Sequence, residues 1–164
     1  MFSRGTIELA TEVLESAQTI GVRIATVETV TAGLIAAALT SVPGASSTVE
    51  RGFILYHESA KATGVGVDPA LSRAHGAVSA EVTAALADGG LNHSTAGVCI
   101  AVTGYAGPDG GTEQDPVGTY YVAMARASED TVVERYHHNG NRNAVRLNAV
   151  ETALSSTLSH LKSN

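Results

Sequence analysis

The sequence predicts a protein of the α/β class, in which a mixed sheet of about five strands carries helices on both faces. Three observations support this class. Segments with apolar residues at helical spacing alternate with short apolar runs. The runs at 22–27 and 96–104 are almost continuously apolar, which is typical of interior strands. Two segments of alternating polarity, 119–126 and 131–138, predict an antiparallel hairpin.

The N-terminal part predicts a helix, a buried strand and a second helix. The first helix is indicated by apolar residues at helical spacing, and Gly21 is expected to end it. These apolar residues are Ile7, Ala10, Val13, Leu14, Ala17 and Ile20. The strand at 22–27 leads through the polar segment "ETVT" into a small-residue helix at 32–44, which Pro43 and Gly44 close. A second strand is expected at 47–56.

Three short helices are expected between residues 57 and 90. Asp68 is placed to cap one of them, with Pro69 at its first helical position and Gly76 at its end. Ser79 is placed to cap the next, and Gly89 is expected to end it.

The C-terminal part predicts a strand, a glycine-rich loop at 105–118, the hairpin and a final helix. This helix should run from about Asn141 to Leu161 and bury one row of apolar residues. The row comprises Val145, Val150, Leu154, Leu158 and Leu161, with Leu147 or the neighbours of Asn148 completing it. Because no repeat or linker interrupts the pattern, we expect residues 1–164 to form a single domain.

Composition argues against several classes of protein. The formal net charge is -6, from 10 Lys and Arg against 16 Asp and Glu, and the absence of a dense basic run disfavours nucleic-acid binding. The chain has neither a long apolar span nor a signal peptide, so we expect no membrane partner. Cys99 is the only cysteine and lies in an apolar run. A buried thiol in a reducing compartment follows, and with it a cytoplasmic location.

Three polar loops follow the first three predicted strands, at 28–33, 56–61 and 103–112. Ligands of open α/β sheets bind at the carboxyl ends of strands, so these loops should converge on one cleft if their strands are neighbours. The glycines of this region would leave backbone amides free to cradle a phosphate or an oxyanion. The candidate binding glycines are Gly33, Gly104, Gly107, Gly110 and Gly111.

The first loop holds Glu28, Thr29 and Thr31 at the start of a helix. Thr31 taken alone is interpreted as an ordinary helix N-cap, and Glu28 mainly as a structural acceptor, although both are candidate substrate contacts. Thr29 lies between Glu28 and Thr31, deeper in the loop than Thr31, where helix-end amides could stabilise an alkoxide or an oxyanion.

The second loop holds Lys61, one of only two lysines in the chain. A lone lysine is usually a solvated surface group, but a desolvated one can act as a base towards a hydroxyl nucleophile. Tyr56 is placed to orient it. The adjacent residues His137 and His138 should point to opposite faces of a strand, and no His or Cys pair has the spacing of a zinc site. We therefore expect no metal, and we also expect no cofactor.

Six segments resemble, in order and spacing, the C-terminal domain of the CinA competence/damage-inducible protein family, whose stand-alone members include bacterial nicotinamide mononucleotide deamidases. The segments are "ETVTAG", "SVPGASS", "YHESAKATGVGV", "GAVSAEV", "TGYAGPDGGTEQDPVGT" and "GNRNAVRLNAV". The resemblance implies a three-layer α/β/α sandwich, a homo-oligomer and metal-free hydrolysis of nicotinamide mononucleotide to nicotinic acid mononucleotide and ammonia. The substrate would be a small pyridine mononucleotide.

The resemblance also implies roles for individual residues. The family's lysine falls on Lys61, its tyrosine on Tyr56, its glycine-loop threonine on Thr103 and its arginine before the last helix on Arg142. The family's serine nucleophile, however, is replaced by Thr29.

Two neighbours of the nucleophile differ as well, because Val30 stands for a cysteine and Ala32 for the first of two glycines. The added methyl of threonine crowds the line of attack, and Ala32 places a Cβ where the loop would otherwise be bare. Three hypotheses stay open: an active amidohydrolase, a catalytically silent nucleotide-binding or interaction domain, and an amidase for another small amide.

Overall fold

A five-stranded mixed sheet forms the centre of the protein, seen here in a computed structural model that describes residues 2–163. The strands are β1 (Ile24–Glu28), β2 (Val49–Ile54), β3 (Val98–Gly104), β4 (Thr119–Arg126) and β5 (Val132–His137). Their order across the sheet is β2-β1-β3-β4-β5. β1 runs parallel to β2 and β3, whereas β4 runs antiparallel to both β3 and β5. The predicted mixed sheet and C-terminal hairpin are confirmed.

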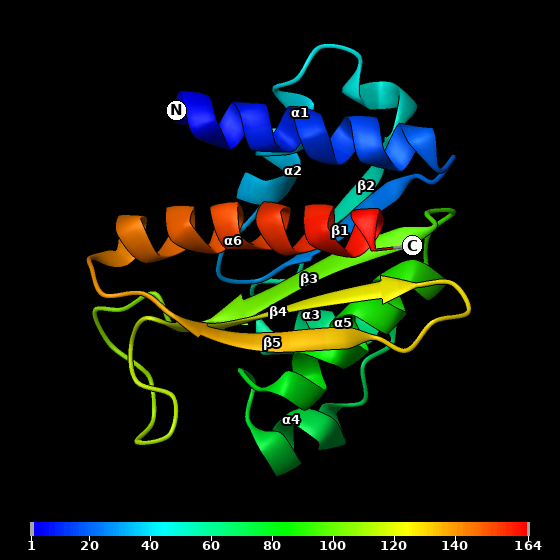
Figure 1. The fold of residues 1–164 in the computed structure, drawn as a ribbon. Coiled ribbons are helices and arrows are strands. Elements are labelled where there is room, and N and C mark those ends of the chain that lie inside the picture. Colours follow the sequence, from blue (N-terminus) through cyan, green and yellow to red (C-terminus); the bar gives the residue numbers. More distant parts are fainter. Residues whose placement is uncertain (1, 164) are drawn as a thin grey trace.

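Helices cover both faces of this sheet, which gives the predicted three-layer α/β/α sandwich (Figure 1). One face carries α1 (Arg4–Thr19), α2 (Leu34–Thr40) and α6 (Arg142–Lys162). The other face carries α3 (Glu58–Val65), α4 (Pro69–His75) and α5 (Ala80–Asn92). A short 3₁₀ turn, Ala45–Ser47, precedes β2. No helix within residues 2–163 is long and apolar enough to cross a bilayer.

The two apolar cores follow from the alternation of side chains along the buried strands. In β3, Val98, Ile100 and Val102 belong to the core under α1, α2 and α6, while Cys99 and Ala101 belong to the core under α5. The α5 side uses smaller residues, so this helix lies close to the sheet.

Close packing of α5 explains one wrong prediction. Gly89 does not end the helix, which continues to Asn92. A Cβ at Gly89 would collide with the Val65 carbonyl, and one at Gly90 would collide with Val27 and Cys99. The two glycines therefore serve contact with neighbouring elements rather than termination.

One further detail differs from expectation. α2 is shorter than predicted and begins at Leu34, with Gly33 rather than Thr31 as its N-cap. The predicted apolar row on α6 is buried or partly buried, and it is completed by Ala149, a neighbour of Asn148, rather than by Leu147, which is 40% exposed. The caps formed by Asp68 and Ser79 are confirmed, since each side chain accepts a backbone N–H in the first turn of its helix.

Candidate active site

The three polar loops meet at a cavity of about 250 Å³ beside the carboxyl ends of β1, β2 and β3. Thr29 and Val30 line it from the segment between β1 and α2, which we call the elbow (residues 29–33). The second loop contributes Tyr56, Glu58 and Lys61, the third contributes Gly104 and Ala106, and Arg142 comes from the start of α6. The strand order β2-β1-β3 makes this convergence possible, as the sequence predicted.

Glu28 ends β1 and is completely buried, with an exposed fraction of 0%. One of its carboxylate oxygens accepts the N–H groups of Gly33 and Ile35, at 2.9 and 3.0 Å. The other accepts the N–H of Ala36 at 2.9 Å and the hydroxyl of Thr26 at 3.1 Å. Since the protein itself occupies this carboxylate, the contacts agree with the structural interpretation of Glu28, and its contact with substrate stays a prediction.

Thr29 follows Glu28 at the wall of the cavity. Its hydroxyl donates a hydrogen bond of 3.0 Å to the carbonyl of Val102 in β3, and its N–H donates to the same oxygen at 3.2 Å. The hydroxyl therefore lies at the cavity with its proton directed to the backbone of the neighbouring strand.

The remainder of the elbow is strained and partly unsatisfied. Ala32 has φ +49°, in the left-handed region that disfavours residues with a Cβ, and Gly33 has φ +92°. The hydroxyl of Thr31 is buried and has no hydrogen-bond partner within residues 2–163. The N-cap interpretation of Thr31 is thus wrong, because the amides at the start of α2 bind the Glu28 carboxylate instead.

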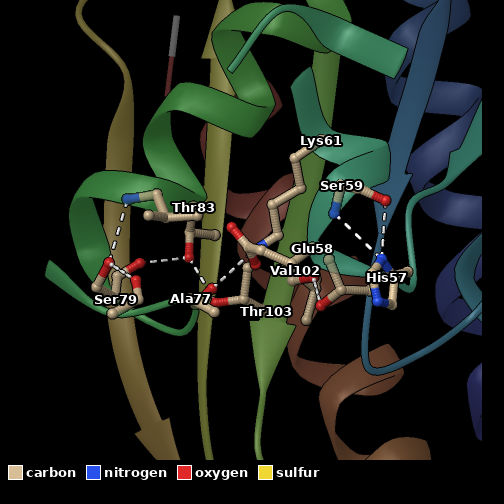
Figure 2. Close-up of polar contacts among 12 residues, drawn as sticks. His57, Glu58, Ser59, Lys61, Ala77, Ser79, Thr83, Val102 and Thr103 are labelled. Atoms are coloured by element: carbon tan, nitrogen blue, oxygen red, sulfur yellow. Dashed lines mark hydrogen bonds and ion pairs between the residues drawn. The ribbon is translucent and has the colours of Figure 1, made fainter. Parts of the chain in front are cut away.

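Lys61 is almost completely buried but is not alone. Its ammonium lies 2.7 Å from a Glu58 oxygen and donates to the Ala77 carbonyl at 3.0 Å, contacts that can be followed in Figure 2. Burial raises the pKa of Glu58, but the hydrogen bonds and charges contributed by Lys61, Ser72 and His57 together outweigh this, and the pKa lies below its ordinary value of 4.5. The carboxylate is therefore ionised at neutral pH. Lys61 and Thr29, both among the described residues, form no hydrogen bond with each other.

Tyr56 contacts Arg142 rather than Lys61, so the predicted orienting contact is not present. Nη2 of Arg142 donates to the Tyr56 hydroxyl at 2.6 Å, and Nη1 donates to the Gly107 carbonyl at 2.8 Å. Because Tyr56 is 60% exposed, this arrangement lies at the rim of the cavity. The guanidinium joins the end of β2 to the glycine-rich loop.

Thr103 is fully buried and does not line the cavity. Its hydroxyl pairs with that of Thr83 in α5 at 2.7 Å, and Figure 2 shows the two side chains together. A contact between Thr103 and a ligand would require this pair to open. The Thr103 side chain therefore joins the end of β3 to α5.

The glycines of the third loop divide into two groups. Gly104 lines the cavity, and a Cβ there would lie 2.6 Å from Cβ of Tyr120, so the position requires glycine. Gly107, Gly110 and Gly111 have positive φ angles and shape the loop. Gly107 supplies a carbonyl to Arg142, whereas Gly110 and Gly111 do not line the cavity.

Two site residues escaped the sequence analysis, Glu58 and Arg146. Arg146 donates from Nε to the Val30 carbonyl at 3.0 Å and from Nη2 to the Thr31 carbonyl at 3.1 Å. Helical spacing could have found both, since Glu58 lies three residues before Lys61 and Arg146 lies four residues after Arg142.

Other features of the chain do not add to this site. Cys99 is buried, and burial raises the pKa of its thiol to about 12. Within residues 2–163, no group of three or more His, Cys, Asp or Glu could hold a metal ion. A larger cavity of about 610 Å³ between α4 and α5 contains none of the predicted site residues.

Comparison with known proteins gives a consistent result. A family model described as the CinA C-terminal domain matches residues 6–161. Nicotinamide-nucleotide amidohydrolase PncC of Escherichia coli K12 is 37% identical over 148 residues, which make up 90% of each chain. A crystal structure of the competence/damage inducible protein CihA from Agrobacterium tumefaciens superposes with a TM-score of 0.93 at 35% identity, covering 99% of this chain and 98% of that one.

Some relatives are much longer. A CinA-like protein of Myxococcus xanthus is 41% identical over 152 residues, which cover 93% of this chain but 36% of that protein. The chain thus spans about a third of the length of this group of relatives.

Proposed function

The chain belongs to the CinA C-terminal domain family, and we propose that it is an amidohydrolase that converts nicotinamide mononucleotide into nicotinic acid mononucleotide and ammonia, with Thr29 as nucleophile. One observation carries this proposal: a hydroxyl (Thr29), an amine (Lys61) and a guanidinium (Arg142) line one cavity of about 250 Å³. The similarity to a nicotinamide-nucleotide amidohydrolase over nine-tenths of both chains supports the choice of substrate.

The chemistry follows the pattern of covalent acyl transfer. The Thr29 oxygen attacks the carboxamide carbon while its proton passes to the neutral form of Lys61. The lysine returns this proton to the departing nitrogen, which leaves as ammonia, and the acyl group remains as an ester on Thr29. Water then attacks the ester with proton transfer through Lys61, releasing the nicotinic acid mononucleotide and restoring the hydroxyl.

Two contacts must change before attack. The Thr29 hydroxyl must leave the Val102 carbonyl, and Lys61 must give up a proton although it lies 2.7 Å from the Glu58 carboxylate. Arg142, at the rim, provides a fixed positive charge for the substrate phosphate. Its bond to Tyr56 holds it across the opening.

The same two contacts favour a second candidate, a domain that binds the mononucleotide without turnover. In this case the Thr29–Val102 and Lys61–Glu58 contacts would persist in the complex. A third candidate, an amidase for another small amide, would use the same residues with a different occupant of the rim.

The test measures release of ammonia and nicotinic acid mononucleotide by four proteins: the natural chain and its Thr29→Ser, Thr29→Ala and Lys61→Ala variants. The proposal expects turnover that both alanine variants lose. A natural chain that binds the mononucleotide but turns over only as Thr29→Ser would favour the silent domain. Hydrolysis of nicotinamide or another small amide in its place would favour the third candidate.

Three broader properties also belong to this proposal. We infer a homo-oligomer from the resemblance to the family, which light scattering at several concentrations tests. The free Cys99 thiol fits a reducing cytoplasm. A single folding unit across 1–164 predicts one cooperative thermal transition.

A further inference from the structure

We propose that Arg146 is a positioning residue, which holds the backbone of the elbow so that the N–H groups of Val30 and Thr31 are available to the oxyanion of the reaction. The inference rests on the proposed function, because it concerns the charge that forms when Thr29 attacks a carboxamide. It starts from the hydrogen bonds of the three peptide groups that follow Thr29.

Each carbonyl of these peptide groups has a donor within the protein. The Thr29 carbonyl accepts the N–H of Ala32 at 3.1 Å. The Val30 carbonyl accepts Nε of Arg146 at 3.0 Å. The Thr31 carbonyl accepts Nη2 of Arg146 at 3.1 Å and the N–H of Leu34 at 3.2 Å. The orientation of all three peptide planes is therefore set.

The N–H groups of the same three peptide groups do not all have a hydrogen-bond acceptor among the described residues. The N–H of Ala32 closes the turn onto Thr29, but those of Val30 and Thr31 donate to no group within residues 2–163. In a trans peptide the N–H points away from the preceding carbonyl. The N–H of Thr31 is thus directed away from Arg146, which holds the Val30 carbonyl.

The position of these two donors suits acyl transfer. They belong to the two residues that directly follow the proposed nucleophile, and Val30 lines the cavity. Fixed backbone donors stabilise the negative oxygen of a tetrahedral intermediate because they need not reorganise during the reaction. A carbonyl bound to a cation also polarises its own peptide group, which strengthens the N–H of that group as a donor.

Arginine is suited to this task because its planar fork reaches two carbonyls at once. Nε and Nη2 of one guanidinium contact two consecutive residues of the elbow, 116 and 115 positions away in sequence. A lysine at this position would keep the positive charge, but its single ammonium group lacks the planar fork that reaches both carbonyls. The opposite end of the elbow is tied separately by Glu28.

The activity experiment compares the natural chain with Arg146→Lys and Arg146→Ala, and uses Arg4→Ala as the matched control. Arg4 is a surface residue that pairs with Glu8 on α1, away from the cavity. Removing one oxyanion donor outright costs about 100- to 1000-fold in kcat, so a mispositioned donor should cost about 10- to 100-fold. We expect this loss in kcat for Arg146→Lys, a KM changed by less than about threefold, and an unchanged Arg4→Ala.

A residue needed only for folding would give another pattern, with a lower melting temperature and an unchanged kcat per folded molecule. That pattern, or full kcat in folded Arg146→Ala, would overturn the inference. Arg146→Lys keeps the experiment informative if Arg146→Ala does not fold.

A second measurement is independent of turnover. If Arg146 holds the elbow, its loss should let the Ala32–Thr29 turn open more often and accelerate amide hydrogen exchange of Ala32 at least about tenfold in Arg146→Lys. Unchanged exchange at Ala32 would refute the positioning role. The natural chain could lack deamidase activity while Arg146→Lys still speeds this exchange. That result would refute the proposed function but support the role of Arg146 in holding the elbow.

Discussion

Replacing Glu28 by Gln should destabilise the protein substantially, although the two side chains have almost the same shape. The carboxylate accepts three amides and one hydroxyl in a fully buried position. In the best arrangement of the side chain in Glu28→Gln, the new NH₂ group faces Thr26, whose hydroxyl can turn to accept from it, and Ala36 loses its acceptor. An unpaired buried amide costs about 1–3 kcal/mol.

The two remaining bonds, from Gly33 and Ile35, should each weaken by about 1 kcal/mol because a neutral acceptor replaces a charged one. Relief from burying a charge offsets part of this loss. We therefore expect the free energy of unfolding to fall by about 2–3 kcal/mol. For a domain of this size the melting temperature should fall by about 4–12 °C.

Differential scanning calorimetry at neutral pH provides the measurement. Glu15→Gln is the matched control, since Glu15 is an exposed residue of α1 and should leave the transition within about 1 °C. A fall of less than about 2 °C for Glu28→Gln would refute the reasoning, because it would mean that the carboxylate does not organise the start of α2.

Three further predictions concern single residues. Ala32→Gly should raise the free energy of unfolding by up to about 1 kcal/mol, because relief of the left-handed strain exceeds the entropy that glycine adds to the unfolded chain; a lower melting temperature would contradict this. Glu58 has a lowered pKa, so its stabilising effect is present above pH 4.5 and is lost as the pH falls through the folded-state value. The difference in melting temperature between the natural chain and Glu58→Gln should therefore shrink as the pH is lowered below 4.5, and a constant difference would exclude the ion pair with Lys61 as its source. Cys99, with a thiol pKa of about 12 and no exposed surface, should resist a disulfide reagent at pH 8 until the protein unfolds, and rapid labelling of the folded protein would disprove its burial.

Local patterns were sufficient for most elements of the fold. The caps at Asp68 and Ser79 lie within three residues of the amides they bind, so sequence spacing alone predicts them. The buried runs of β1 and β3 are recognisable because their side chains enter apolar cores on both faces of the sheet. The predicted helix end at Gly89 was wrong because the reason for that glycine lies in another element, at Val65.

The candidate site shows where local reasoning stops. Local patterns identified Thr29 and Lys61 as residues with suitable chemistry, and the family resemblance added Arg142. The strand order brought the three residues to one cavity. The sequence did not identify their partners. Tyr56 binds Arg142 rather than Lys61. Glu58 forms an ion pair with Lys61, the lysine that was expected to act as a base.

The sequence by itself determined the α/β class, the elements and the three loops that could carry chemistry, because periodicity, capping and turn signals act over a few residues. Only the tertiary structure decided which polar groups meet. The Thr29–Val102, Tyr56–Arg142 and Val30–Arg146 contacts join residues 73, 86 and 116 positions apart. Such pairs depend on the path of the whole chain through the sheet, and no local pattern of residues encodes that path.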